Sequence, residues 1–278
     1  MESSSIPSLA VQTESLTVPN WLELPRDATV NILQKLNTVD IITRACHVCP
    51  LWWNICKDPS MWRTIRMNMD LTYNRACWKK ICHTAVGRSR GQLEDVNIKY
   101  FATDDLLQYI VDCSKQLRRL RLIDCRSLTY EGFSEALNKL PLLEALDIYH
   151  CTLSEDLLEV VGRHCPLLNS LRYRNSIDDE EGYIDISNEH ELALLEETFW
   201  RVGFYNILNT GNFVTNEGVS AILDGCPLLE TLDLRGCRSW VLSDSLEKRC
   251  HQQIQDFRSP IYYVYFSFNG QLILGPAK

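Results

Sequence analysis

The sequence predicts an α/β protein in which a small helical bundle is followed by a short repeat solenoid, with parallel strands on its concave face and helices outside. Three observations predict this fold class: short apolar helical patterns over residues 19–66, an apolar triplet that recurs from residue 93, and a helical stretch after each triplet. The chain of 278 residues is 45% hydrophobic and 23% charged, which is ordinary for a globular protein.

The predicted bundle carries the start signals of several short helices. Pro25 opens the first helix, and Asn37 or Thr38 caps the second. Pro50 and Pro59 begin two further turns, each rich in Trp or aliphatic side chains. A bundle of roughly fifty residues cannot bury so many large apolar side chains within itself. Some of them are therefore expected to contact a partner.

Over residues 93–250 the chain repeats one unit, an apolar triplet at positions one, four and six, usually with Cys or Asn at position nine. The copies begin at Leu93, Leu117, Leu143, Leu168 and Leu229. The first four starts are 24, 26 and 25 residues apart, which is the period of leucine-rich repeats. In such repeats the triplet forms a short strand and a helix follows on the outside. The cysteines of the pattern are expected to be buried and structural.

The interval from Leu168 to Leu229 exceeds two periods. Counting back one period from Leu229 gives a degraded copy, Phe204-Ile207-Asn209-Asn212. The surplus is an acidic insertion near 176–190, which we expect to be a solvated loop. An unpaired Asn209 in the stack would cost about 1 to 3 kcal/mol and would loosen that copy.

The formal net charge of −8 is concentrated in one stretch. Nine acidic residues and no Lys or Arg lie between Asn175 and Trp200, so the remainder of the chain is nearly balanced. This distribution predicts no nucleic-acid partner and no attraction to an anionic membrane.

The remaining segments are assigned from local composition. Residues 1–18 are expected to be a flexible tail, and 67–92 a connecting helix. Residues 251–278 are expected to be an irregular tail, in which Asn269-Gly270 indicates a hairpin. No basic residue precedes Arg26 and no apolar run approaches a membrane span, so we expect a nuclear or cytoplasmic location with free cysteines.

Apolar residues of the bundle fall where an F-box carries its signature: Leu24-Pro25, Ile32-Leu33, Leu36, Val48-Cys49, Trp52 and Ile55. With the repeats that follow, the stretch from Asn20 to Arg249 resembles the plant F-box/leucine-rich-repeat proteins, in particular the subgroup of Skp-interacting partners. Pro50-Leu51 departs from the basic or polar pair usual in F-boxes. The resemblance implies a non-catalytic adaptor of an SCF (Skp-cullin-F-box) ubiquitin ligase. Its F-box would bind the Skp adaptor and, through it, cullin, while the repeats would hold an unknown protein substrate.

The resemblance also implies two sets of binding residues. The residues expected to bind Skp are Leu24, Pro25, Ile32, Leu33, Leu36, Val48, Cys49 and Trp52. The residues expected to contact the substrate, on the concave strand faces, are Arg118, Arg119, Arg121, Glu144, Asp147, Arg172, Arg174, Glu230, Asp233 and Arg235. Two alternatives remain open. The charges could be ordinary solvated surface, and the chain could be a protein-binding scaffold without ligase function.

Catalytic and metal chemistry are not indicated. Cys46-x-x-Cys49 with His47, and Cys77 with Cys82-His83, lack the second converging pair that a zinc site needs. The sequence has no Gly-x-Ser-x-Gly motif and no Gly-rich phosphate loop, and its acidic segment lacks the ligand spacing of a calcium loop. We therefore expect no enzyme activity, no metal and no cofactor.

Overall fold

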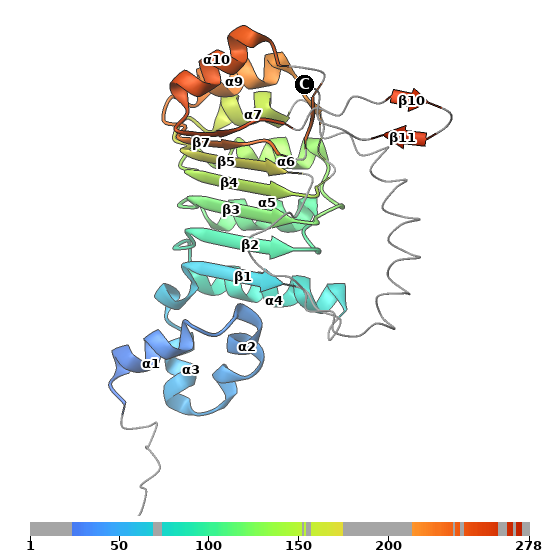
Figure 1. The fold of residues 1–278 in the computed structure, drawn as a ribbon. Coiled ribbons are helices and arrows are strands. Elements are labelled where there is room, and N and C mark those ends of the chain that lie inside the picture. Colours follow the sequence, from blue (N-terminus) through green and yellow to red (C-terminus); the bar gives the residue numbers. More distant parts are fainter. Residues whose placement is uncertain are drawn as a thin grey trace, which may run out of the picture.

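The chain forms a small helical end joined to a curved repeat solenoid, which confirms the predicted fold class (Figure 1). The computed structural model describes residues 24–68, 74–151, 153, 157–174, 213–235, 237–239, 242–260, 266–268 and 271–273. The predicted tail over 1–18, the acidic insertion near 176–190, the degraded copy at 204–212 and the turn at Asn269-Gly270 lie outside these residues. Within the described part, no helix combines the length and apolarity needed to cross a bilayer.

The helical end contains three α-helices and two short 3-10 turns. They are α1 (Arg26–Leu33), α2 (Thr38–Thr43), η2 (Ala45–His47), α3 (Pro50–Cys56) and η3 (Pro59–Trp62). The Asn37 side chain accepts a hydrogen bond from the Asp40 amide at 2.8 Å, so Asn37 is the cap of α2. Pro50 is the first residue of α3, and the Cys49 sulfur accepts from the Trp52 amide at 3.5 Å. The departure at Pro50-Leu51 therefore leaves the third helix intact.

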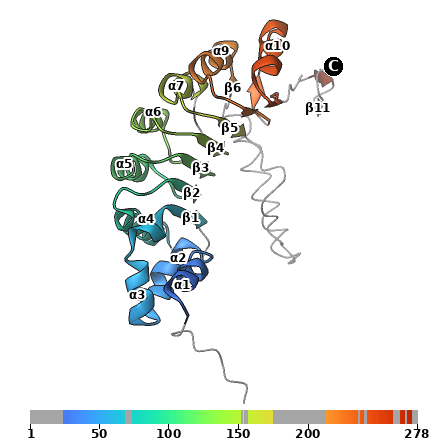
Figure 2. The ribbon, with the colours of Figure 1, turned by 90° about the vertical axis from the view of Figure 1, so that its left-hand side faces the viewer.

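Seven parallel strands of the described residues form one sheet along the inner face of the solenoid (Figures 1 and 2). In spatial order they are β1 (Thr64–Asn68), β2 (Asp95–Lys99), β3 (Arg119–Ile123), β4 (Ala145–Tyr149), β5 (Ser170–Arg174), β7 (Thr231–Asp233) and β9 (Asp256–Arg258). The apolar residues at position four pair directly from strand to strand, as Val96, Leu120 and Leu146 do. All three are almost fully buried, so one continuous core runs along the sheet.

The helices cover the outer, convex side of the sheet (Figure 2). They are α4 (Arg75–Ser89), α5 (Asp104–Cys113), α6 (Tyr130–Leu137), α7 (Leu157–His164), α9 (Asn216–Gly225) and α10 (Asp244–Gln253). Two short strand pairs lie outside the main sheet. They are the parallel pair β6 (Phe213–Val214) with β8 (Arg238–Ser239), and the antiparallel pair β10 (Phe266–Phe268) with β11 (Gln271–Ile273).

The repeat sheet extends beyond the predicted range 93–250 at both ends. At the start, Trp62, Ile65 and Met67 occupy positions one, four and six of a further unit, and all three are buried. At the other end, β9 pairs with β7. Sequence analysis missed the first unit because Trp and Met replace the expected aliphatic residues. Helix α4 is accordingly the helix of this first repeat, and the chain needs no separate connecting segment.

The predicted degraded copy does not interrupt the stack, because β5 pairs directly with β7. The thiols at position nine show the same order, since each donates to the carbonyl oxygen of position six in the preceding repeat. Cys125 donates to Ile98 at 3.7 Å, and Cys237 donates to Tyr173 at 2.9 Å. The repeat that begins at Leu168 therefore immediately precedes the one that begins at Leu229. Residues 175–212 lie between strand β5 and its own helix, α9.

The helices on either side of this insertion approach closely at two glycines. A Cβ atom at Gly162 on α7 would lie 2.5 Å from the carbonyl oxygen of Ala221, and a Cβ atom at Gly225 on α9 would overlap the Gly162 carbonyl group. Both obstacles are backbone atoms, which a side-chain rotation cannot move. The two glycines thus allow α7 and α9 to pack as adjacent helices despite the inserted residues.

We predict that Gly225→Ala lowers the free energy of unfolding by about 1 to 3 kcal/mol, because the helices must separate to admit the methyl group. Urea unfolding followed by circular dichroism would measure the change. Gly87→Ala is the matched control, because Gly87 is an exposed helical glycine whose Cβ would meet only the Tyr109 hydroxyl at 3.4 Å. The control should be neutral or slightly stabilising. Equal unfolding midpoints for Gly225→Ala and the unmodified chain would contradict the close helix packing.

Candidate protein-binding surfaces

The helical end exposes several of the apolar residues that were predicted to bind Skp. Ile32 is 38% exposed, Leu36 40% and Val48 61%. Pro25 is also exposed, while Leu24, Cys49 and Trp52 are half-buried. Leu33 is 0% exposed, so its assignment as a docking residue is wrong. Leu33 faces the core because it lies one position past Ile32, which turns it about 100° around the helix axis, to the inner face of α1.

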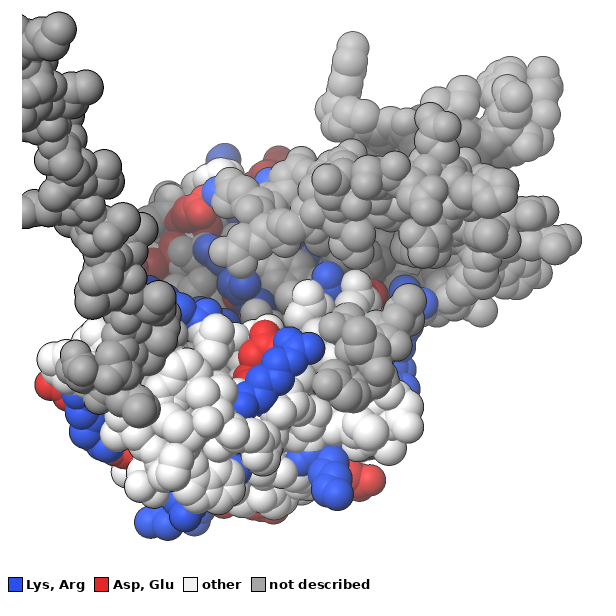
Figure 3. Space-filling view, turned by 90° about the horizontal axis from the view of Figure 1, so that it is seen from below, with Lys and Arg blue, Asp and Glu red and all other residues white. Residues whose placement is uncertain are grey.

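Seen from below, the helical end presents a mostly uncharged surface with a few charged side chains (Figure 3). One ion pair holds α1 against the start of η3, where Arg26 donates to Asp58 at 2.7 Å. The hydrogen bond from Arg26, followed by those from Ser60, lowers the pKa of Asp58 to about 2. Asp58 therefore stays ionised into the acid range, where an ordinary carboxyl group would be protonated, and keeps its ion pair with the first helix of this surface.

One arginine joins the helical end to the solenoid. The Arg88 guanidinium of α4 lies 5.5 Å from the ring centroid of Trp53 and 5.4 Å from that of Trp62. Arg88 also donates to the Cys46 sulfur at 3.2 Å. Such cation–π contacts contribute about 0.5 to 2 kcal/mol each. Because Trp62 also begins the first repeat, the helical end and the solenoid share one core.

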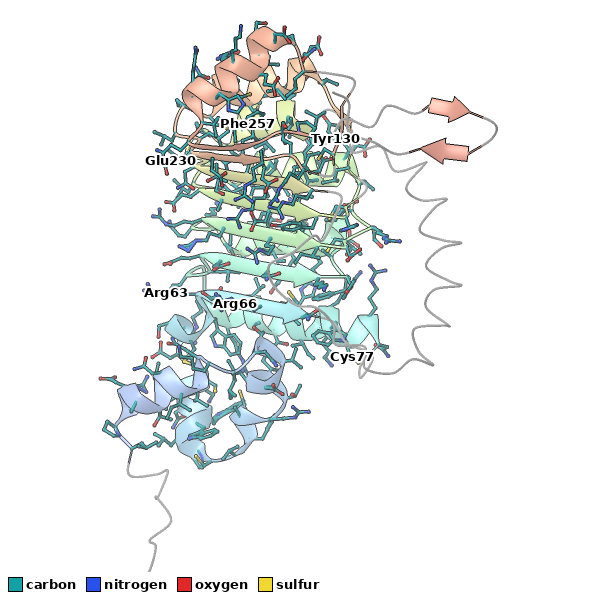
Figure 4. All side chains as sticks on the ribbon, in the orientation of Figure 1. Arg63, Arg66, Cys77, Tyr130, Glu230 and Phe257 are labelled. Atoms are coloured by element: carbon teal, nitrogen blue, oxygen red, sulfur yellow. The ribbon has the colours of Figure 1, made fainter. Side chains whose placement is uncertain are left out.

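The predicted substrate-contacting residues lie on the strand face and its edge. Arg119, Arg121, Asp147, Arg172, Arg174 and Asp233 are in strands, Arg235 follows β7, and Arg118, Glu144 and Glu230 precede strands. Figure 4 shows Arg66 on β1 near the helical end and Glu230 beside the far strands. Sequence analysis missed Arg66 and Arg258, because they belong to the two unrecognised strands. It missed Lys99 because the repeat that begins at Leu93 matches the triplet pattern only weakly.

The outward-facing strand positions carry more basic than acidic side chains, although the whole chain is acidic. The basic ones are Arg66, Lys99, Arg119, Arg121, Arg172, Arg174 and Arg258, and the acidic ones are Asp95, Asp147, Asp233 and Asp256. Because parallel pairing keeps equivalent positions in line, these charges gather on one face. The concave face is therefore the basic side of an acidic protein.

Two of the acids on this face are buried within ion pairs. Asp147 is 8% exposed and accepts from Arg121 at 2.8 Å, and Arg172 lies 4.0 Å away. Asp233 is 1% exposed and is paired with Arg174 and Arg235. Both carboxylates are thus engaged in ion pairs with arginines of neighbouring strands.

The pKa of Asp233 reflects its burial and its two partners. Burial by itself raises the pKa of a carboxyl group, but the hydrogen bonds that Arg235 and Arg174 donate outweigh it and hold the pKa of Asp233 below its ordinary value. Asp233 is thus a structural anion that keeps the two arginines in place across β5 and β7.

The strand face is hollowed near the helical end. The hollow has a volume of about 320 Å³ and is lined by Arg66, Asp95, Asn97, Arg119, Leu120, Arg121, Ala145 and Asp147, from strands β1–β4. Within the described part of the chain, neither Arg66 nor Arg119 takes part in an ion pair. This hollow offers polar groups and space for a polar side chain of a partner.

All twelve cysteines are free thiols in the structure. Burial raises the pKa of Cys82, Cys165 and Cys226 to about 12 in each case. Cys46 and Cys49 are used in the hydrogen bonds described above, and the described residues contain no cluster of His, Cys, Asp and Glu able to hold a metal. The buried thiols act as small core residues with weak hydrogen bonds.

Comparison with known proteins first defines the class of the helical end. Residues 21–68 match the family model described as F-box-like. These residues include α1–α3 and end with β1, so the F-box also contains the first strand of the solenoid. The protein is therefore of the class that combines an F-box with leucine-rich repeats.

Whole-chain comparison then gives the family. The chain is 39% identical to F-box protein SKIP19 of Arabidopsis thaliana, over 94% of this chain and 83% of that protein. It is 38% identical to the Arabidopsis F-box/LRR-repeat protein 23, over 94% of this chain but only 57% of that relative. The chain belongs to the plant F-box/leucine-rich-repeat family, which confirms the resemblance stated above. A solved tropomodulin C-terminal domain of Caenorhabditis elegans is similar only at a TM-score of 0.39 and 13% identity, covers 63% of this chain and 90% of that domain, and supports no conclusion.

We predict that Asp233→Asn lowers the free energy of unfolding at pH 7 by about 3 to 5 kcal/mol, because it removes the buried carboxylate with which Arg174 and Arg235 both pair. The lowered pKa of Asp233 also makes the stability of the protein depend on pH. The carboxylate stabilises the fold above its ordinary pKa of 3.8, and this contribution is lost as the pH falls through the folded-state value. The variant should therefore lose less stability on acidification than the unmodified chain.

Urea unfolding across the acid range would measure both effects. Asp256→Asn is the matched control, because Asp256 is paired with Arg258 on the same face but its side chain is 50% exposed. The control should change stability by less than about 1 kcal/mol. A similar loss in both variants would show that burial of Asp233 is not the cause.

We predict that iodoacetamide modifies Cys77 before the buried thiols. Cys77 is exposed, whereas Cys82 on the same helix is 0% exposed and its raised pKa leaves little reactive thiolate. Peptide mass spectrometry would follow the labelling of native protein with time. Labelling of Cys82 should require denaturant, and equal rates for the two residues in the native protein would contradict the packing of α4.

Proposed function

We propose that this chain is a non-catalytic substrate-recognition adaptor of an SCF ubiquitin ligase. The F-box docks on the Skp subunit and thereby on cullin, and the repeats bind the protein to be ubiquitinated by other subunits. The proposed location is the nucleus or the cytoplasm. The observation that carries the proposal is the exposure of Ile32, Leu36 and Val48 on the largely uncharged helical end, within the residues that match the F-box.

These side chains expose apolar surface that the described residues do not cover. Exposed apolar surface of this kind on a folded domain supports a protein partner. Ile32 and Leu36 stand one helical turn apart, at the end of α1 and in the turn that follows. The Arg88 contacts join this surface to the first repeat, which supports a role that links the two binding surfaces.

A second function is a repeat scaffold that binds a protein without supporting ubiquitin transfer. This alternative would follow if Pro50-Leu51 weakened Skp docking, or if the degraded repeat removed substrate binding. Helix α3 begins at Pro50 and is intact, which supports the adaptor.

We predict that the double variant Ile32→Ala/Val48→Ala weakens Skp binding by about 10- to 100-fold, because it truncates exposed apolar contacts at the interface. Calorimetric titration of purified Skp into the full chain would measure the effect. Leu167→Ala/Leu228→Ala is the matched control, because these leucines are exposed on the solenoid, far along the chain from the F-box. Undiminished Skp binding by the Ile32/Val48 variant would overturn the docking assignment.

Co-purification from plant cells separates the adaptor from the scaffold. An adaptor should recover both Skp and cullin, and the Ile32→Ala/Val48→Ala variant should recover neither. Recovery of other proteins without Skp or cullin would favour the scaffold.

A further inference from the structure

The hollow between β1 and β4 has an arrangement of charge that the proposed docking function does not use. Its lining brings together three arginines and two aspartates, Arg66, Arg119, Arg121, Asp95 and Asp147. Asp147 is held by Arg121 at 2.8 Å. The groups left to act on a ligand are therefore the guanidinium groups of Arg66 and Arg119 and the carboxylate of Asp95.

Two guanidinium groups that take part in no ion pair among the described residues favour oxyanions as ligands. Arginine presents a planar set of donors that matches a carboxylate, and charge-assisted hydrogen bonds are about twice as strong as neutral ones. Beyond the hollow, the Arg172 side chain on β5 is 42% exposed on the same face, although it lies 4.0 Å from Asp147. Arg66 and Arg119 lie on different strands, so an extended segment can reach both of them, whereas a single small anion cannot.

The strand spacing sets the distance between the anions. Arg66 is in register with Asn97 and Arg121, whereas Arg119 is in register with Asp95, so the two arginines are two strands apart and offset by two residues along the strands. Their Cα atoms are therefore separated by about 12 Å. In an extended peptide, side chains on one face recur every second residue, so two of them that are four positions apart are separated by about 13 Å. Two acidic residues separated by three residues therefore match the two arginines.

We propose that this hollow binds an extended acidic segment of the protein substrate, with one carboxylate held by Arg66 and a second by Arg119. The proposal rests on the proposed function, since it names the chemistry of the substrate that the repeats hold. Asp95 lies on β2, between the two arginines, and opposes the incoming carboxylates. It limits how tightly a purely acidic segment binds.

Fluorescence anisotropy of the full chain with a labelled peptide of alternating Glu and Ser tests the proposal. Arg66→Gln/Arg119→Gln should weaken binding by about tenfold or more. Asp95→Asn should instead tighten it by about two- to fivefold, because a repelling charge is removed. Arg163→Gln/Lys248→Gln is the matched control. It removes the same charge from exposed positions on α7 and α10, and it should leave binding within about twofold.

Several outcomes would overturn the proposal. They are no binding of the Glu peptide, unchanged binding in the Arg66/Arg119 variant, or an equal loss in the control. A matched peptide with Gln in place of Glu should not bind. If a phosphoserine peptide binds and the Glu peptide does not, the ligand is a phosphate and not a carboxylate. That result would overturn the proposal. Urea midpoints should be equal for all variants, which excludes unfolding as the cause.

Skp binding, measured on the same preparations, keeps the two proposals apart. The Arg66→Gln/Arg119→Gln variant should bind Skp normally, because neither side chain is among the docking residues. Failure of the unmodified chain to bind Skp would overturn the adaptor function, while the peptide result would still decide the ligand of the hollow.

Discussion

The solenoid depends on one constraint: each strand pairs in register with the next, so that its apolar residues fall directly on those of its neighbours. The buried column that includes Val96, Leu120 and Leu146 is the direct result. The same register fixes every outward-facing residue in a column of its own. Like charges directly opposite each other are destabilising, and the column formed by Arg121, Asp147 and Arg172 alternates in sign. Core packing and surface charge are thus set by the same pairing.

The overall fold could be predicted from the sequence because the triplet and its period report this register directly. Prediction failed where other residue types replaced the aliphatic residues of the triplet, or where the spacing of the repeats was misleading. Trp62 and Met67 fill aliphatic positions with other large side chains, so the first repeat was assigned to the bundle and linker. Counting in periods from Leu229 placed a repeat between Leu168 and Leu229, but β5 pairs directly with β7, so no strand of the main sheet separates these two copies. The Thr215-x-Glu217-Gly218 sequence matches Thr129-x-Glu131-Gly132 at the start of α6, and it marks the helix of an existing repeat.

The candidate sites were predictable in kind but not in detail. An apolar pattern marks α1 as amphipathic, but Leu33 and Ile32 are adjacent and equally apolar, and only packing decides that one is core and the other is exposed. On the strand face, alternation identifies which residues point outward. It does not show that Asp147 and Asp233 are enclosed by arginines, because those contacts join residues from different repeats. Accessibility depends on neighbours that are distant in sequence.

The first strand belongs both to the F-box and to the repeat sheet, and this sharing has a mechanical consequence. The helical end runs directly from η3 into β1, so the distance of each strand from the helical end increases by about 4.8 Å per strand. A protein held at the hollow between β1 and β4 would lie within about 15 Å of the F-box end of the sheet. Additional repeats at the far end of the sheet would lengthen the solenoid without changing the position of the bound protein. Short members of the family could therefore present a target at the same offset as longer ones.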